Sequence, residues 1–138
     1  MIAIVCVDDK GGIMFNHRRQ SQDRIMRQRI LNITQGRPLW MSTYSAKQFT
    51  NDGCLNKIHI DNDFPQKAAD GDFAFFEGDS LAAVDERLER VIIFRWNRTY
   101  PADQYLDIDL EKDGWNCERV GDFKGSSHEQ ISEEVYTR

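Results

Sequence analysis

The apolar run Ile2–Val7, next to the start of the chain, constrains the fold more than any other feature. The run is too short for a helix, and the polar residues 8–10 and the pair Gly11-Gly12 end it at once. A short run bounded in this way is typical of a strand that is buried on both faces in the middle of a parallel sheet. Ligands of open α/β sheets bind beyond the carboxyl ends of such strands, so the loop expected at residues 13–20 is the first place to look for a site.

Other short apolar runs alternate along the chain with stretches of helical spacing. One helix is expected after Asp23, which can cap it, and a second over residues 81–88, with Asp79 as its cap. The apolar residues that share one side of the first helix are Ile25, Met26, Ile30 and Ile33. Further strands are expected at residues 39–41, 57–60, 73–76 and 91–94. Strands that alternate with helices in this way predict a mostly parallel α/β sheet.

The C-terminal part of the chain has a different pattern. Residues 115–123 and 130–136 alternate between apolar and polar side chains, and residues 125–128 carry a turn signal. This pattern predicts an antiparallel hairpin at one edge of the sheet. Another turn is expected at residues 50–54. The 138 residues fit one domain, 1–138. We expect a three-layer α/β sandwich with a mostly parallel central sheet and a C-terminal antiparallel hairpin.

Charge and cysteine content limit where the chain works and what it binds. Its formal net charge of −5 disfavours binding to duplex DNA, because a long duplex needs a basic surface. The cysteines Cys6, Cys54 and Cys117 form no close pair, as expected for reduced thiols. No apolar run approaches the roughly 20 residues of a membrane span, and no basic region precedes the first run, as it would in a signal peptide. We therefore expect a cytoplasmic protein with no membrane partner.

Three segments occur in a recognisable order. Residues 4–8 lead to Gly12-Ile13, residues 36–41 read Gly-Arg-Pro-Leu-Trp-Met, and residues 73–78 read Phe-Ala-Phe-Phe-Glu-Gly. They resemble, in turn, the first strand and Gly-Ile loop, the Gly-(Lys/Arg)-Pro strand entry, and the cofactor-site strand and glycine turn of the dihydrofolate reductase family. With the strands that follow, the resemblance covers nearly the whole chain. It implies a dihydrofolate-reductase-like fold and, for a working member, NADPH and a folate as ligands.

The substrate side of that family's site is poorly matched. The family's loop contains a Leu-Pro-Trp segment, followed by a carboxylate that assists protonation of the pterin. Ungapped counting places Met26 at the position of that acid, and Asp23 lies three residues earlier. Asp23 is interpreted either as a helix cap or as the catalytic acid of a divergent reductase. Phe94 replaces the family's threonine and fills space where a pterin would lie.

The cofactor side is also altered. The resemblance assigns Ser42, Thr43, Gly78 and Asp79 to a cofactor site, but the first two replace the family's phosphate-contacting Gly-Arg-(Lys/Arg)-Thr segment. The N-terminus of a helix attracts phosphate through its free N–H groups. Carboxylates at Glu77 and Asp79 would repel it. Together with the missing arginine, they disfavour NADPH.

Basic and aromatic side chains gather at the same expected edge of the sheet. Five arginines and one histidine fall within residues 17–29, either as a solvated surface or as a cradle for phosphate or carboxylate, which guanidinium binds with paired hydrogen bonds. Residues 95–101 interleave arginines with aromatic side chains, either for packing or for stacking on a nucleotide base. The candidate ligand-binding residues are Val7, Ile13, Asn16, Arg18, Arg19, Arg27, Phe94, Arg95 and Trp96.

No metal site is expected. His59, Asp61 and Asp63 share a face only if a strand continues through them, and aspartate more often ends strands in turns. His128 follows two serines, but adjacent side chains diverge, which favours a turn over a nucleophile–base pair. The H-x-H-x-D-H cluster of metallo-β-lactamase-type nucleases is absent from the sequence.

Three functions remain open at this point. The first is a binding protein without reductase activity, which holds a small anionic or nucleotide-like ligand, or a short RNA, between residues 11–19 and 94–100. The second is a divergent NAD(P)H-dependent reductase with Asp23 as its acid. The third is a structural or interaction protein whose pocket is filled by side chains such as Phe94 and Met26. The sequence is also compatible with a homodimer.

Overall fold

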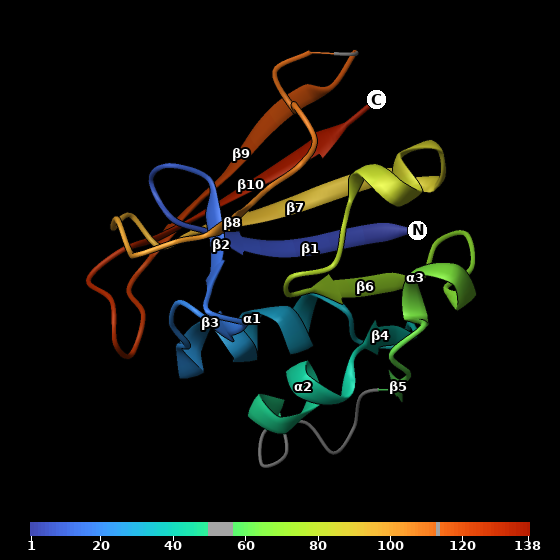
Figure 1. Cartoon of the computed structure of the whole chain (residues 1–138), viewed down its shortest axis with the longest axis horizontal. Helices are drawn as coiled ribbons and strands as arrows, with labels where there is room; N and C mark the ends of the chain where they lie inside the picture. Colours follow the sequence, from blue (N-terminus) through green and yellow to red (C-terminus); the bar gives the residue numbers. More distant parts are fainter. Residues whose placement is uncertain (50–56, 113) are drawn as a thin grey trace.

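A computed structural model describes residues 1–49, 57–112 and 114–138. Within these ranges a seven-stranded sheet has β1 near its centre, paired in parallel with β6 on one side and β7 on the other, while β10 runs antiparallel to β7 (Figure 1). In spatial order the strands are β5 (Ile58–Ile60), β4 (Leu39–Met41), β6 (Phe73–Phe76), β1 (Ile2–Val7), β7 (Arg90–Arg95), β10 (Ile131–Thr137) and β9 (Asn116–Phe123). The mostly parallel sheet and its terminal hairpin are as the sequence predicts. The turn expected at residues 50–54, which includes Cys54, lies outside the described residues.

Alternating residues of the strands pack against helices on opposite faces of the sheet. Ile4 of β1 belongs to a buried cluster with Met26 and Ile30 of α1 (Arg24–Ile33). Val5 belongs to a second cluster with Phe64 and Val84, on the other face. The remaining helical segments are α2 (Thr43–Ala46), η1 (Lys47–Phe49), α3 (Phe64–Lys67) and η2 (Ala82–Arg87). This arrangement confirms the three-layer sandwich, because strand side chains alternate between faces. None of the helices in the described ranges is both long and apolar enough to span a bilayer.

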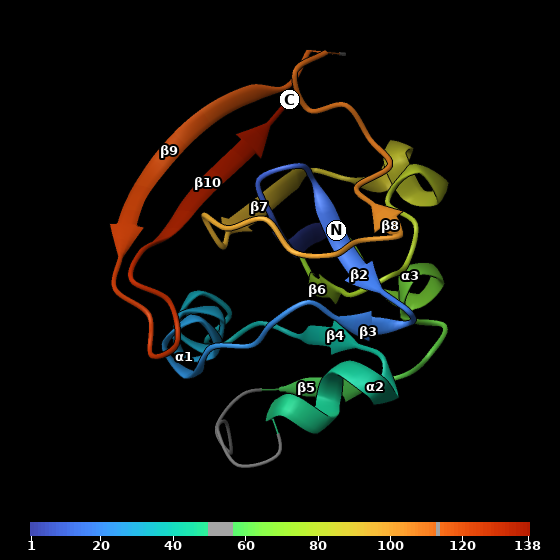
Figure 2. The same ribbon diagram turned by 60° about the vertical axis from the view of Figure 1, so that its left-hand side comes forward.

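The segment expected as a loop after β1 forms two short strands instead. β2 (Gly12–Phe15) pairs antiparallel with β3 (Arg18–Arg19) and with β8 (Gln104–Tyr105), in a second, three-stranded sheet (Figure 2). Asn16 and His17 make the turn with φ angles of 52° and 60°, the left-handed region that suits a tight hairpin. The loop prediction was wrong because β8, the partner that orders this segment, is too short to show an apolar pattern.

The helix expected over residues 81–88 is a short 3₁₀ segment, and Asp79 does not cap it. Asp107 accepts hydrogen bonds from the amides of Leu81 and Ala82, each at 3.0 Å. The Ser80 hydroxyl accepts one from the Ala83 amide at 3.1 Å. Burial raises the pKa of Asp79, and the nearby Glu77 carboxylate adds to this effect. The sequence interpretation was wrong because the cap comes from a residue far along the chain.

Replacing Asp107, the observed cap, should destabilise the protein, whereas replacing Asp79, the cap expected from the sequence, should not. Asp107→Ala is expected to lower the free energy of unfolding by about 1 kcal/mol, the usual effect of losing a side chain that caps free amides. Asp79→Ala is the matched control and should leave it unchanged or raise it, because a half-buried carboxyl is removed. Urea denaturation of both variants checks this, and an equal loss in the two variants would contradict the assignment.

Candidate functional site

The carboxyl ends of β1, β6 and β7, where the sequence predicts a ligand, enclose almost no free space. The cavity there has a volume of about 10 Å³, which is room for about one water molecule. Pockets for small-molecule ligands usually measure roughly 300–1,000 Å³. The chain's own side chains therefore fill this edge of the sheet. They are Cys6, Ile13, Arg19, Gln20, Ser21, Met26, Phe76, Glu77 and Trp96.

An ion pair between Arg19 of β3 and Glu77, the residue after β6, lies across this edge. Nε of Arg19 is 3.0 Å from Oε2 of Glu77, and Nη2 is 3.1 Å from Oε1. The Ser45 hydroxyl donates to Oε1 at 2.8 Å. The guanidinium also lies over the Tyr44 ring, 4.2 Å from its centre. The side chains of Arg19 and Glu77 are only 19% and 10% exposed. Arg19 and Ser45 thus hold the Glu77 carboxylate as they would hold the carboxylate of a ligand.

Residues 8 and 9, just before the first of the two segments between which a ligand is expected, contact the second segment directly. The Asp9 amide donates to the carbonyl of Arg98 at 2.9 Å, and the Tyr100 amide donates to Oδ2 of Asp8 at 3.2 Å. Asp8 is buried. Burial by itself raises the pKa of Asp8, but hydrogen bonds, foremost from the Gly12 amide, bring it below its usual range. An ionised carboxylate therefore ties residues 98–100 to the end of β1.

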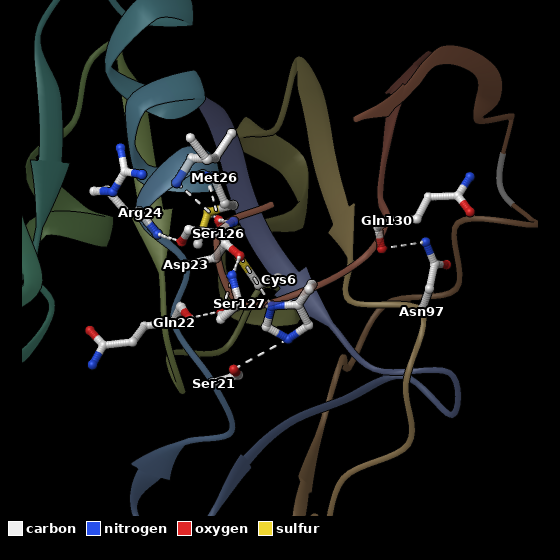
Figure 3. A network of polar contacts seen from close by, with 12 residues as sticks. Cys6, Ser21, Gln22, Asp23, Arg24, Met26, Asn97, Ser126, Ser127 and Gln130 are labelled. Carbon is white, nitrogen blue, oxygen red and sulfur yellow. Dashed lines mark hydrogen bonds and ion pairs between the residues drawn. The ribbon is translucent and has the colours of Figure 1, made fainter. Parts of the chain in front are cut away.

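Asp23 caps α1, which agrees with its interpretation from the sequence as a helix cap. Its Oδ1 accepts from the amides of Ile25 and Met26 at 2.9 and 3.1 Å. The amides of Ser126 and Ser127, in the connection between β9 and β10, donate to Oδ1 and Oδ2 at 3.0 and 2.8 Å (Figure 3). The Asp23 carboxylate thus joins the start of α1 to a segment far along the chain.

The remaining contacts of Asp23 keep it ionised. The Ser127 hydroxyl lies 3.0 Å and Nδ1 of His128 3.2 Å from Oδ2. Burial by itself raises the pKa of Asp23, but hydrogen bonds, first from the amides of Ser126 and Ser127, hold it far below its usual range. Gly125 passes so close that a Cβ there would overlap the carboxylate. Asp23 is not among the residues that line the cavity at the carboxyl edge.

The structure brings only some of the candidate ligand residues together. Ile13, Arg19 and Trp96 line the small cavity at the carboxyl edge. Val7 is buried beside them, and its carbonyl accepts from the Trp96 amide at 3.0 Å. Asn16 and Arg18 are exposed and Arg27 is half-buried, and these three do not line the cavity. The basic cluster of residues 17–29 therefore does not converge as a whole on one point.

Phe94 and Arg95 are directed into packing and pairing within the sheet. Phe94 is fully buried, and its ring meets that of Phe123 edge-on with 6.2 Å between centres. Nε of Arg95 lies 2.5 Å from Oε1 of Glu134, on the neighbouring strand β10. Both residues thus have partners inside the chain.

The glycine turn that the resemblance assigns to a cofactor is covered. Gly78 has a φ of 90°, and a Cβ on it would overlap the sulfur of Met14 from β2. The Gln104 side-chain amide donates to the Gly78 carbonyl from β8. The small sheet therefore packs directly on this turn. The sequence did not predict this contact, because residues 13–20 are expected there as a loop.

Ser42 and Thr43, the other residues assigned to a cofactor, also have partners in the chain. The Ser42 hydroxyl caps α2 by accepting from the Ser45 amide at 3.1 Å. Thr43 donates its amide and its hydroxyl to Oδ1 of Asn62, at 2.9 and 3.0 Å.

The histidine-containing segments differ in part from expectation. His59 stacks on Trp40 with 4.5 Å between ring centres, and within residues 1–49, 57–112 and 114–138 no three His, Cys, Asp or Glu side chains lie where they could share a metal ion.

Nδ1 of His128 lies 3.0 Å from the hydroxyl of Ser127. The expectation that these adjacent side chains diverge was therefore wrong, because both of them turn toward Asp23.

A larger hollow, which the sequence does not predict, lies between α1 and the β9–β10 hairpin. Its volume is about 540 Å³. At its wall, Arg29 of α1 holds Glu133 of β10 with two hydrogen bonds, of 2.7 and 3.0 Å. Its lining residues are Ile25, Gln28, Arg29, Asn32, Val120, Gly121, Asp122, Phe123 and Glu133.

Comparison with known proteins bears on the fold. No family model matches the chain, and no curated protein matches it by sequence. Among solved structures, it is similar to dihydrofolate reductase from Enterococcus faecalis complexed with NADP(H) and RAB-propyl. The TM-score is 0.62 at 14% sequence identity, and the match covers 99% of this chain and 95% of that one. The chain therefore has a dihydrofolate-reductase-like α/β fold.

Proposed function

We propose that this protein binds a small anionic ligand at the carboxyl edge of its sheet and does not reduce folates. The observation that supports this function best is the Arg19–Glu77 pair. Arg19 presents a planar guanidinium that is stacked on Tyr44, and Ser45 adds a hydroxyl donor. This donor set suits carboxylates and phosphates, and the chain's own Glu77 occupies it.

Binding requires that the ligand replaces Glu77, since the cavity itself holds about 10 Å³. A carboxylate or phosphate can compete because it offers Arg19 the same two hydrogen bonds that Glu77 offers. Arg19 belongs to β3, which is two residues long and pairs with β2 alone in its sheet. Few backbone hydrogen bonds therefore oppose a displacement of this strand.

A reductase is supported less well. The Asp23 carboxylate has donors on both oxygens and does not line the cavity at the carboxyl edge. Met14 and Gln104 cover the Gly78 turn, which leaves no opening there for a pyrophosphate. The residues that would hold NADPH are thus engaged with the chain itself.

Thermal melts with a library of small carboxylates, phosphates and nucleotides test the proposal. A ligand at 100 times its Kd stabilises by about 3 kcal/mol, which raises the midpoint of a domain of this size by several degrees. Glu77→Gln, which frees Arg19, should increase the shift for the same compounds. Arg19→Gln should abolish it, and Glu86→Gln, at an exposed carboxylate of η2 before the amino end of β7, should bind like the original protein.

A structural or interaction protein with a filled pocket is the second candidate, and the volume of about 10 Å³ favours it. It predicts that no compound shifts the melt of the original protein or of Glu77→Gln. That result would contradict ligand binding at this edge.

A further inference from the structure

We propose that Ser21, His128 and Asp23 form a nucleophile–base–acid site that transfers acyl groups from small esters. This activity goes beyond the binding proposed above and uses a different set of side chains. Oγ of Ser21 lies 3.3 Å from Nε2 of His128, and Nδ1 of His128 lies 3.2 Å from Oδ2 of Asp23. A serine, an imidazole and a carboxylate joined in this order are the arrangement that activates a serine hydroxyl.

The surroundings of His128 fix which ring nitrogen carries the proton. Asp23 is ionised and can only accept at Oδ2. The Ser127 hydroxyl, 3.0 Å from Nδ1, has its own acceptor in the Gln22 carbonyl at 2.8 Å. When the imidazole carries one proton, that proton therefore sits on Nδ1, and Nε2 can accept from the hydroxyls of Ser21 and Tyr100, at 3.3 and 2.8 Å. Figure 3 shows Asp23 beside Ser127, with Ser21 further from both.

The imidazole ring is held in place on its other sides as well. It stacks on Trp96 with 4.5 Å between centres and 24° between planes. The Tyr100 hydroxyl lies 2.8 Å from Nε2, the nitrogen that Ser21 also approaches. The His128 side chain is 2% exposed, whereas Ser21 is half-exposed. A buried, oriented base next to a reachable hydroxyl is what a nucleophilic site requires.

A small hollow lies next to His128. Its volume is about 170 Å³, and Trp96, Asn97, Arg98 and His128 contribute to its wall, whereas Ser21 does not line it. The ester carbonyl would meet the half-exposed Ser21 hydroxyl from the surface, and the hollow beside His128 has room for one small group of the ester. It is too small for a folate or a dinucleotide, because pockets for ligands of that size exceed roughly 300 Å³.

The reaction proceeds in two balanced steps. Oγ of Ser21 attacks the ester carbonyl, its proton moves to Nε2 of His128, and the carbon–oxygen bond to the leaving group breaks as the alcohol takes that proton. Water then attacks the acyl-serine and gives a proton to Nε2, and the carboxylic acid leaves as Ser21 regains its proton. Asp23 stabilises the imidazolium formed in each step without itself accepting a proton.

Tyr100 offers His128 a second hydroxyl, and this makes the assignment testable. Because a phenol is more acidic than a serine hydroxyl, Tyr100 is the competing donor to Nε2. Tyr100→Phe removes that competitor and leaves Ser21 as the hydroxyl partner of Nε2 among the contacts described above. Labelling of Ser21 should therefore persist or become faster in this variant.

Covalent labelling with a small alkyl fluorophosphonate, in which Oγ displaces fluoride from phosphorus, tests the site. Intact mass and peptide mapping should place one adduct on Ser21 in the original protein and in Tyr100→Phe, and none in Ser21→Ala. His128→Gln should slow labelling and p-nitrophenyl acetate hydrolysis by about 100-fold, the usual effect of losing a general base.

Circular dichroism of each variant confirms folding before labelling, and Glu86→Gln, at an exposed carboxylate of η2, is the control outside the site. Should His128→Gln not fold, Ser21→Ala and Tyr100→Phe decide. Absence of an adduct in the original protein, an adduct on Tyr100 or another residue, or equal ester hydrolysis by Ser21→Ala would overturn the proposal.

Discussion

Asp23→Ala is expected to lower the free energy of unfolding by about 3–5 kcal/mol near neutral pH. The substitution removes a helix cap, which contributes about 1 kcal/mol. It also leaves the amides of Ser126 and Ser127, whose hydrogen bonds to Asp23 are partly buried, without their acceptor, and an unpaired donor costs up to about 1–3 kcal/mol when it is buried. Urea denaturation of the variant measures the loss. Asp61→Asn, at an exposed carboxylate that pairs with Lys67, is the matched control and should have a midpoint close to that of the original protein.

The effect of Asp23→Ala should depend on pH, with a sign that follows from the lowered pKa. The folded-state pKa of Asp23 is far below the value of about 3.9 in the unfolded chain. Its ionised form therefore stabilises the protein fully above about pH 5, and this stabilisation is lost as the pH falls through and below about 4. The gap between the original protein and the variant should narrow as the pH falls toward the folded-state pKa. A gap that stays constant from neutral pH to pH 3, or one below about 1 kcal/mol at neutral pH, would contradict this account of the Asp23 contacts.

Phe94→Ala is expected to have a similarly large effect, a loss of about 3–5 kcal/mol in the free energy of unfolding. Phe94 is fully buried on the central strand β7, where it packs against Phe123 and belongs to the cluster around Ile4 and Met26. Removing its ring leaves a cavity that the surrounding strands can refill only in part. Urea denaturation measures the effect, and Val120→Ala, at a side chain that is 50% exposed, should change stability by less than about 1 kcal/mol.

Phe94→Thr, which restores the residue implied by the family resemblance, should destabilise nearly as much as Phe94→Ala. It removes most of the ring and adds a hydroxyl to a dry site, and a buried hydroxyl without a partner is unfavourable. If either Phe94 variant kept the stability of the original protein, Phe94 would not be a core residue, and its interpretation as part of an open ligand site would regain support.

The central layer of the fold could be predicted because its signal is local. The runs Ile2–Val7 and Phe73–Phe76 are almost wholly apolar, and burial on both faces of a parallel strand requires that pattern. The cap at Asp23 was readable for the same reason, since a cap and the helix that it starts are neighbours in sequence.

The parts that could not be predicted depend on partners that are distant in sequence. The β2–β3 hairpin is ordered by β8, about 90 residues further along. Arg19 meets Glu77 across 58 positions, and no local pattern distinguishes this arginine from its exposed neighbour Arg18. The sequence predicts that the carboxylates of Glu77 and Asp79 repel a phosphate at this turn. It does not reveal that Glu77 pairs with Arg19.

The central claim is that the chain's own side chains occupy the cleft in which a reductase of this fold would work. Titration of the protein with NADPH, followed by tryptophan fluorescence in the presence and absence of dihydrofolate, tests it most directly, because Trp96 lines that edge. We predict no saturable change at micromolar NADPH and no oxidation of the coenzyme. Saturable quenching at micromolar NADPH, together with folate-dependent oxidation of the coenzyme, would contradict the claim.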